Sequence, residues 1–265
     1  FGQTSIFTNT STIASGGMTF DWDFGDGTTS TLSSPTKSFP AISTFTVQLK
    51  ATSNANCITI LNRNVGIYHT PIAGFSLGNV CEGVNVPFVN NSSIGSGTLT
   101  YQWDFGDVTN STLTVPVKSY AASGTYSISL IATSDFNCTN QITQPIDIYP
   151  NPAANFVVPD NCQDQVFNFA NNSTSALGTL SYSWDFDDAS ASTLINPIKS
   201  YSLPGTYNVS LLATTSLGCV NTINKAVTVF PVPLADFTLT DACQDAVFNF
   251  INSSSVSTGT LTYDW

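Results

Sequence analysis

Apolar and polar residues alternate along several short stretches of this chain. The clearest alternation recurs as Phe45-Val47-Leu49-Ala51, Tyr126-Ile128-Leu130-Ala132 and Tyr207-Val209-Leu211-Ala213, with one residue between neighbours in each set. A period of two over four positions predicts a strand with one face against a core. Because no long stretch follows the 3.6-residue period of an amphipathic helix, we expect little or no helix.

The same pattern returns at a fixed interval. A Trp-Asp-Phe motif begins at Trp22, Trp103 and Trp184, and a further copy begins at Trp265. Neighbouring copies are 81 residues apart, since 103 − 22, 184 − 103 and 265 − 184 are equal. Self-similarity at one period indicates a tandem array of domains. The predicted domains are residues 1–69, which lack the first strand, 70–150 and 151–231, which are complete, and 232–265, which hold an N-terminal part.

Each complete unit carries the strand patterns of a small β-sandwich. About seven short antiparallel strands, with a tryptophan on the third, describe an immunoglobulin-like domain whose tryptophan points into the core. Trp22, Trp103 and Trp184 are therefore predicted core residues rather than exposed platforms for sugars. Proline restricts the backbone of the short linkers between the units, so we expect the domains to be held in line as a linear rod. These linkers are residues 69–71, 150–152 and 231–233.

The composition limits the partners that the chain can bind. There are 6 Lys and Arg against 17 Asp and Glu, and the formal net charge is −11. Nucleic acids and anionic membrane surfaces are bound through clusters of Lys or Arg, so neither is an expected partner. No apolar run reaches the ~18 residues of a membrane-spanning helix, so we expect no membrane insertion by this segment.

Three motifs of the first unit point to a known family. Residues 22–27 read Trp-Asp-Phe-Gly-Asp-Gly, and they are followed by Pro35-x-x-x-Phe39 and by Phe45-x-Val47-x-Leu49. This set resembles the polycystic kidney disease (PKD) domain family. The resemblance implies an extracellular β-sandwich that serves as a spacer, or in adhesion through contacts with proteins or glycans.

Later units depart from this motif in the turn that follows the tryptophan strand. The second unit has Val108 in place of the last glycine, and the third reads Asp-Phe-Asp-Asp-Ala at 185–189, without either glycine. These changes leave the turn geometry open but not the fold. With two cysteines per unit, the array also resembles repeats in large surface adhesins of gliding, Bacteroidota-type bacteria.

The six cysteines form two series with the repeat period: Cys57, Cys138 and Cys219 in one, and Cys81, Cys162 and Cys243 in the other. Two cysteines per small β-domain outside the cytosol indicate disulfides rather than a metal site, because no CxxC motif or histidine cluster is present. Pairing within a domain would give Cys81–Cys138 and Cys162–Cys219.

The expected strand topology favours a different pairing. The first turn and the last loop of such a domain lie at opposite ends of strands ~23 Å long, whereas the Cα atoms of a disulfide are about 4.4–6.8 Å apart. The chain leaves one domain at the end that carries the first cysteine and enters the next at the end that carries the second. An inter-domain bond between Cys81 and Cys219 is therefore preferred, and the other cysteines would pair outside this sequence. Pairing within a domain and free thiols stay open as alternatives.

Carboxylates gather at the turns after the tryptophan strands, including Asp21, Asp23 and Asp26 in the first unit and Asp104 and Asp107 in the second. Such oxygen-rich turns can hold Ca²⁺, but side chains that accept backbone N–H groups within the turn explain them more simply. No other cofactor is expected. Lys37, Lys118 and Lys199 recur with the repeat and are interpreted as solvated strand edges.

No catalytic arrangement recurs between the units. His69 is the single histidine and lies in a linker, so a Ser-His-Asp or Cys-His site cannot repeat, and we do not expect an enzyme. The first hypothesis is a structural and adhesive stalk, or filament segment, of a large bacterial surface protein. Its partners would be neighbouring repeats of the same chain and surface glycans or proteins. The alternative is an accessory glycan- or protein-binding spacer module of a secreted enzyme.

Overall fold

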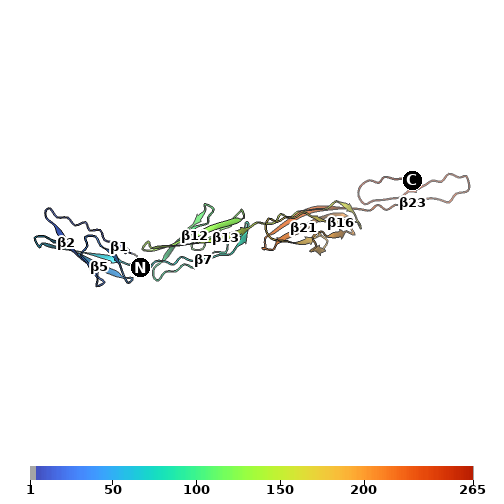
Figure 1. Ribbon diagram of the computed structural model, residues 1–265. Coiled ribbons are helices and arrows are strands. Elements are labelled where there is room, and N and C mark those ends of the chain that lie inside the picture. Colours follow the sequence, from blue (N-terminus) through green and yellow to red (C-terminus); the bar gives the residue numbers. More distant parts are fainter. Residues whose placement is uncertain (1–3, 265) are drawn as a thin grey trace. The chain divides into compact units, whose positions relative to one another are not determined.

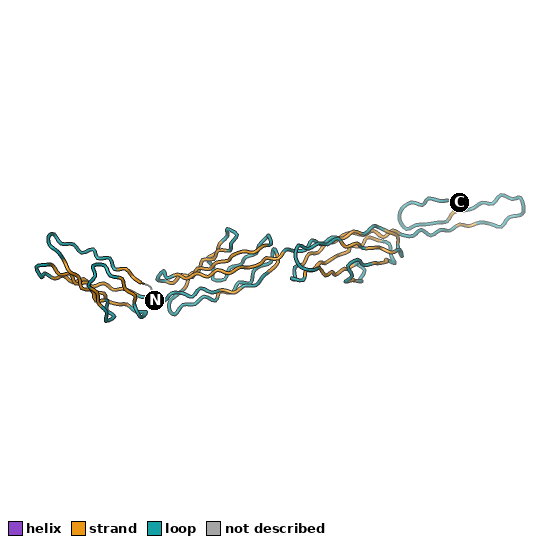
Figure 2. Tube along the Cα trace, viewed as in Figure 1, coloured by secondary structure: helices purple, strands orange, loops and turns teal. Residues whose placement is uncertain are grey.

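The computed structural model describes residues 4–264, and the regular elements of this part of the chain are all β-strands (Figures 1 and 2). The prediction of tandem all-β sandwiches of the immunoglobulin type is confirmed. Trp265, where a fourth copy of the motif begins, lies outside the described residues. No helix in the described part of the chain could cross a membrane.

The strands follow the repeat. The first repeat contains β1 (Thr4–Ile6), β2 (Met18–Asp23), β3 (Thr29–Ser30), β4 (Thr36–Ser38), β5 (Thr44–Ser53) and β6 (Ile58–Gly66). The second contains β7 (Phe75–Ser76), β8 (Val80–Cys81), β9 (Val89–Asn90), β10 (Leu99–Asp104), β11 (Asn110–Ser111), β12 (Gly124–Ser134) and β13 (Thr139–Tyr149).

The third repeat contains β14 (Phe156–Val157), β15 (Asn161–Cys162), β16 (Val166–Asn168), β17 (Ala170–Asn171), β18 (Leu180–Asp185), β19 (Ala191–Ser192), β20 (Ile198–Ser200), β21 (Gly205–Thr215) and β22 (Val220–Phe230). The last residues form β23 (Phe237–Thr238) and β24 (Ile251–Asn252), which pair with each other. The three stretches of alternating apolar and polar residues in the sequence form β5, β12 and β21.

By their contacts, the residues divide into two compact units whose boundary passes through the second repeat. One unit holds the chain up to Gly78, Val86–Lys118 and Thr125–Ile146, and the other holds Asn79–Asn85, Ser119–Gly124 and the chain from Asp147 onward. The predicted domain limits at 69/70, 150/151 and 231/232 follow the sequence period, and they stay a prediction.

The third repeat shows the sandwich most completely. A five-stranded sheet of order β15-β22-β21-β18-β19 faces the small pairs β14-β17 and β16-β20. The outer strand β15 runs parallel to β22, and the other pairs of the large sheet are antiparallel. The second repeat has a sheet of the same kind, β11-β10-β12-β13-β8, and the first has β3-β2-β5-β6.

A tryptophan occupies the core of each of these three repeats. Trp22, Trp103 and Trp184 are 7%, 0% and 1% exposed. Each indole N–H donates to a backbone carbonyl ten residues later, at 3.0, 3.0 and 2.9 Å. Because a buried donor without a partner costs about 1–3 kcal/mol, this bond fixes the loop that follows the tryptophan strand.

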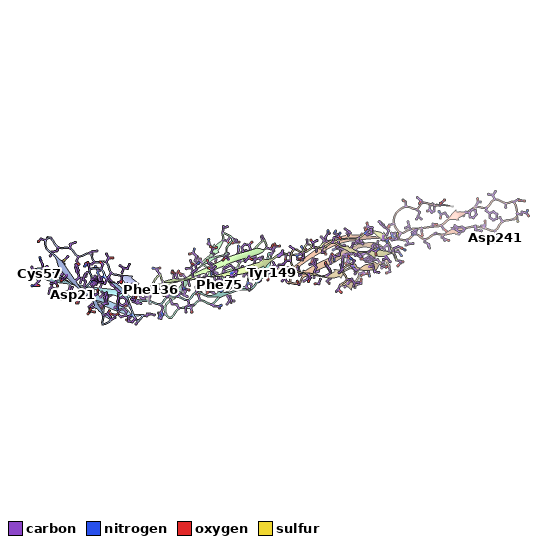
Figure 3. The ribbon with its side chains drawn as sticks, in the orientation of Figure 1. Asp21, Cys57, Phe75, Phe136, Tyr149 and Asp241 are labelled. Atoms are coloured by element: carbon purple, nitrogen blue, oxygen red, sulfur yellow. A yellow bond between two sulfur atoms is a disulfide. The ribbon has the colours of Figure 1, made fainter. Side chains whose placement is uncertain are left out.

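Aromatic rings from the facing small sheets complete the core. In the third repeat Phe156 and Phe169 meet the Trp184 ring edge-on, with centroids 5.1 and 5.6 Å away. In the second repeat Phe75, labelled in Figure 3, has the same relation to Trp103 at 5.2 Å. The buried members of the third core are Phe156, Phe167, Phe169, Trp184, Phe186, Tyr201, Val209, Leu211, Val227 and Val229.

The turn after the tryptophan strand keeps one geometry even where glycine is lost. Its two left-handed positions are Gly25 and Gly27 in the first repeat, with φ of 73° and 85°. The second repeat has Gly106 and Val108 there (72° and 64°), and the third has Asp187 and Ala189 (61° and 65°). A β-branched residue at positive φ is strained. The sequence alone did not determine the geometry of this turn. In the structure all three repeats share it, at the cost of backbone strain where glycine is replaced.

We expect Val108→Gly to stabilise the second repeat by about 1 kcal/mol, because glycine has no left-handed penalty. Val108 is fully exposed, so its removal loses no packing. Hydrogen exchange of the β10 and β12 amides measures the change for this repeat alone. Val117→Gly, at another exposed valine outside the positive-φ positions, is the control and should give no gain. Equal or lower protection in Val108→Gly would contradict the strain argument.

Candidate functional site

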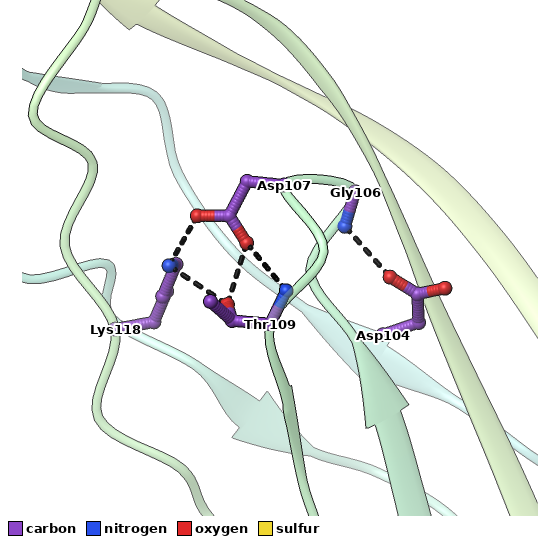
Figure 4. A network of polar contacts seen from close by, with 5 residues as sticks. All are labelled: Asp104, Gly106, Asp107, Thr109 and Lys118. Carbon is purple, nitrogen blue, oxygen red and sulfur yellow. Dashed lines mark hydrogen bonds and ion pairs between the residues drawn. The ribbon is translucent and has the colours of Figure 1, made fainter.

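Two groups of polar side chains repeat along the chain. One is a turn with carboxylates and a lysine that pairs with them, and the other is the set of cysteines near the strand ends. Figure 4 shows the first of them in the second repeat. Asp104 accepts a hydrogen bond from the Gly106 N–H at 2.9 Å. Asp107 accepts from the Thr109 N–H at 3.2 Å and from its hydroxyl at 2.5 Å. The carboxylates are thus occupied by the turn itself.

A lysine that follows the aspartate by 11 residues closes this turn. Lys118 pairs with the Asp107 carboxylate and also donates to the Thr109 hydroxyl at 2.9 Å (Figure 4). The matching pairs are Lys37–Asp26 at 2.7 Å and Lys199–Asp188 at 2.6 Å. Lys37 lies in β4 and Lys199 in β20, which belong to the small sheets, whereas the aspartates follow strands of the large sheets. The ion pair therefore ties the two layers of each sandwich together.

The interpretation of these lysines as solvated strand edges is wrong. The side chains of Lys37, Lys118 and Lys199 are 15%, 13% and 18% exposed. Each ammonium also lies 5.6–5.9 Å from the ring centre of Phe24, Phe105 or Phe186, respectively, within the range of a cation–π interaction. The sequence did hold a signal for this pairing, because the lysine follows its aspartate by 11 residues in all three repeats (37 − 26, 118 − 107, 199 − 188).

The ion pairs lower the pKa of the carboxylates. For Asp107 and Asp188, partial burial alone would raise the pKa, but hydrogen bonds from the lysine and from Thr109 or Ser190 outweigh it, so the pKa lies below 3.8. For Asp26 the hydrogen bonds from Lys37 and then Thr28 lower the pKa to about 2. These carboxylates stay ionised at any physiological pH.

The proposed calcium ligands do not converge. Asp23 accepts from the Gly25 N–H at 2.9 Å, Asp26 pairs with Lys37, and Asp21 lies against Lys50 at 3.3 Å. Among residues 4–264 no group of three or more His, Cys, Asp or Glu side chains is placed to hold a metal ion. The geometry of these turns fits a structural role for their carboxylates, and Ca²⁺ binding remains without support from it.

A hollow of about 250 Å³ in the first repeat is lined by Phe7, Trp22, Leu49 and Arg63, among others. Phe75 and Phe156 contact the core tryptophan at the matching place in the next two repeats. The position that matches Phe75 in the first repeat would precede Phe1, since 75 − 81 is negative. A side chain of the repeat normally occupies this place, so the hollow is not a candidate ligand site.

The second group is the cysteines. Cys81 and Cys219 form a disulfide with a Cα–Cα distance of 5.5 Å, and it joins the second repeat to the third. This is the pairing that the strand topology favours, and neither Cys81–Cys138 nor Cys162–Cys219 is formed. Cys57, labelled in Figure 3, and Cys138, Cys162 and Cys243 are unpaired.

The strand pairing places Cys81 at the end of its repeat. Cys81 closes β8, which runs parallel to β13 and pairs opposite Tyr149, the residue before the linker. Glu82 strengthens this end, since its carboxylate accepts from the Ser123 N–H at 2.7 Å and from the linker Asn151 N–H at 3.2 Å. Both hydrogen bonds keep the pKa of Glu82 below 4.5, the Asn151 bond more strongly.

The loop that carries the other cysteine series has one conformation in all three repeats. The N–H groups of Cys57, Cys138 and Cys219 each donate at 3.1 Å to the hydroxyl of the Ser or Thr four residues earlier. At the first junction Tyr68 stacks on Phe136, with ring centres 3.5 Å apart. Tyr149 in Figure 3 is the repeat-mate of Tyr68, and at its junction the link is the disulfide.

Comparisons with known proteins find one domain family along the chain. A family model described as the PKD domain matches residues 2–65, 68–148 and 149–229. A pre-pro-metalloprotease, PrtV, from Vibrio cholerae serotype O1 is 37% identical over 93 residues, which are 33% of this chain and 10% of that protein. The chain therefore spans about a tenth of the length of this curated relative.

Two solved structures of single domains are also similar. The PKD1 domain of Vibrio anguillarum Epp is 34% identical, with 31% of this chain and 96% of that domain covered and a TM-score of 0.29. The PKD1 domain of the Vibrio cholerae metalloprotease PrtV is 36% identical, with 30% and 96% covered and a TM-score of 0.28.

We expect Lys118→Met to destabilise the second repeat by about 1–2 kcal/mol, because Asp107 is left partly buried without its charge-assisted partner. Hydrogen exchange in β10 and β12 reports the loss. The control is Lys50→Met, which breaks the exposed Asp21–Lys50 pair and should cost the first repeat less than about 0.5 kcal/mol. Equal destabilisation by the two substitutions would mean that the Lys118–Asp107 pair contributes no more to stability than an exposed ion pair.

The stability of the second repeat should also fall in acid. A lowered folded pKa means that the contribution of Asp107 is complete above the unfolded value of 3.8 and is lost as the pH falls through the folded value. Between pH 4 and pH 2 the protection of the second repeat should decline in the wild type and decline less in Lys118→Met. Parallel curves for the two proteins would contradict this assignment.

Tryptic digestion without reduction tests the disulfide. The Lys and Arg positions place Cys81 in the peptide 64–118, Cys138 and Cys162 in 119–199, and Cys219 in 200–225. We expect a cross-link between 64–118 and 200–225, and alkylation of the four remaining cysteines. A cross-link of 119–199 to either of these two peptides, in place of the expected one, would contradict this pairing.

Proposed function

Because this chain belongs to the PKD domain family, we propose that it is a non-catalytic extracellular spacer, a stalk segment of a large surface protein. The observation that carries the proposal is the disulfide between Cys81 of the second repeat and Cys219 of the third. A bond between domains adds nothing to a catalytic centre, but it restricts movement at the junction. Disulfides of this kind persist in oxidising compartments outside the cytosol.

The polar side chains support the same function. The carboxylates and lysines that recur in every repeat serve the turn and the two layers, and the core tryptophans are buried. The acidic net charge of −11 favours solubility of a long array. Within this proposal, a gliding-type bacterial adhesin filament is the finer assignment. Its external partners would be surface glycans or proteins.

A second candidate is an accessory binding module of a secreted enzyme. The similarity to part of a pre-pro-metalloprotease favours it. Such a module binds through an exposed aromatic strip, and the sequence alternative depends on one. In the described second and third repeats, the large aromatic side chains that are exposed are Phe136 and Phe230, one in each repeat. This distribution favours the spacer.

Solution scattering tests the spacer. We expect the oxidised chain to populate a narrower range of radii of gyration than Cys81→Ser/Cys219→Ser, because the disulfide limits motion at one junction. The matched control is Cys57→Ser/Cys243→Ser, which removes two unpaired cysteines and should leave the scattering unchanged. Identical distributions for all three proteins would contradict a stiffening role.

Sedimentation with insoluble polysaccharides and with insoluble protein fibres separates the two candidates. The spacer predicts that the oxidised chain stays in solution with each of them. Saturable co-sedimentation with one of them, weakened by Phe136→Ala or Phe230→Ala, would put the binding module first.

A further inference from the structure

The disulfide connects the end of one strand to the start of another, and this position has a mechanical consequence. Cys81 is the last residue of β8, the second strand of the second repeat. Cys219 directly precedes β22, the last strand of the third repeat. The covalent connection therefore runs from β8, the second strand of one repeat, straight into β22, the last strand of the next.

Tension applied at the chain ends follows the shortest covalent path. That path runs from Pro71 to Cys81, crosses the disulfide, and continues along β22 from Val220 to Phe230. We propose that the disulfide diverts tension around the bodies of the second and third repeats, so that residues 82–218 bear none of it. This inference deepens the proposed function, since it assumes a spacer that is pulled.

In the third repeat, the disulfide removes tension from the hydrogen bonds between strands. Without the disulfide, tension enters at the linker residue Asn151 and leaves at Phe230, so it must cross the sheet. The β21–β22 ladder, paired from Gly205–Val229 to Thr214–Val220, would then be loaded. With the disulfide, tension enters and leaves at the two ends of β22 itself. A strand rises ~3.3 Å per residue, close to the ~3.3–3.6 Å limit of an extended chain, so little slack remains to be drawn out.

The second repeat is relieved in the same way. Tension enters it near Pro71 and leaves at Cys81, along one short segment. Without the disulfide, the load would have to pass through the repeat to Tyr149, the end of β13. The pairs that hold the segment to its neighbours, such as Ile72–Ser93 and Tyr149–Cys81, then only keep it in place.

The first repeat provides an internal reference. Its last-loop cysteine, Cys57, is unpaired, so the shortest covalent path includes the whole of this repeat. It should unfold under tension whether or not the Cys81–Cys219 bond is present.

Single-molecule force spectroscopy of the whole chain, held at its two ends, tests the proposal. With the disulfide intact, we expect unfolding of the first repeat but no events from the second and third. Reduction should add two events. It should also lengthen the fully extended chain by roughly 450–500 Å, because the disulfide spans 138 residues at ~3.3–3.6 Å per residue.

Variants separate connectivity from folding defects. Cys81→Ser/Cys219→Ser should behave in oxidising buffer as the reduced wild type does, and Cys57→Ser/Cys243→Ser should behave as the oxidised wild type. If the double variant does not fold, adding reductant to folded wild-type molecules gives the same comparison. Extra events in the oxidised wild type, or an extended length that does not respond to reductant, would overturn the proposal. The proposed spacer function would then still hold, without a role in bearing tension. Co-sedimentation with a substrate would instead contradict the spacer function itself.

Discussion

Each sandwich depends on burying one tryptophan whose indole N–H must find an acceptor. The ring supplies the largest apolar surface of the core, and its N–H donates to the carbonyl of Leu32, Leu113 or Leu194 in the following loop. That single bond fixes where the loop returns, and hence where the turn carboxylates and the bridging lysine lie. With only 9% of its residues charged, the chain has few other means of specifying how its two layers pack.

Most of the few cationic side chains of this protein make contacts within the repeat that contains them. Of the six Lys and Arg side chains, Lys37, Lys118 and Lys199 repeat one task, the pairing of a turn aspartate across the layers. A fourth, Lys225, donates to the carbonyl of Phe156 and to Asn155 at 2.9 Å. Four of the six cationic side chains are thus engaged in contacts within the fold.

Much of the fold could be predicted from the sequence because the relevant signals are local. Period-two alternation identifies β5, β12 and β21, and the 81-residue interval identifies the array. The Lys118–Asp107 pair was missed because the 11-residue interval, by itself, does not distinguish a lysine that crosses between layers from one on a strand edge. The turn at Val108 was left open because the cost of a left-handed valine depends on whether the surrounding bonds, here those of Asp104 and Asp107, outweigh it.

The Cys81–Cys219 bond also changes what a break in the backbone does. A protease that cuts at any one place between residues 82 and 218 opens a loop but leaves the two ends of the chain covalently joined through the disulfide. Most of the exposed loops of the second and third repeats lie within this stretch. A spacer outside the cell could therefore be nicked there and still hold together whatever it connects.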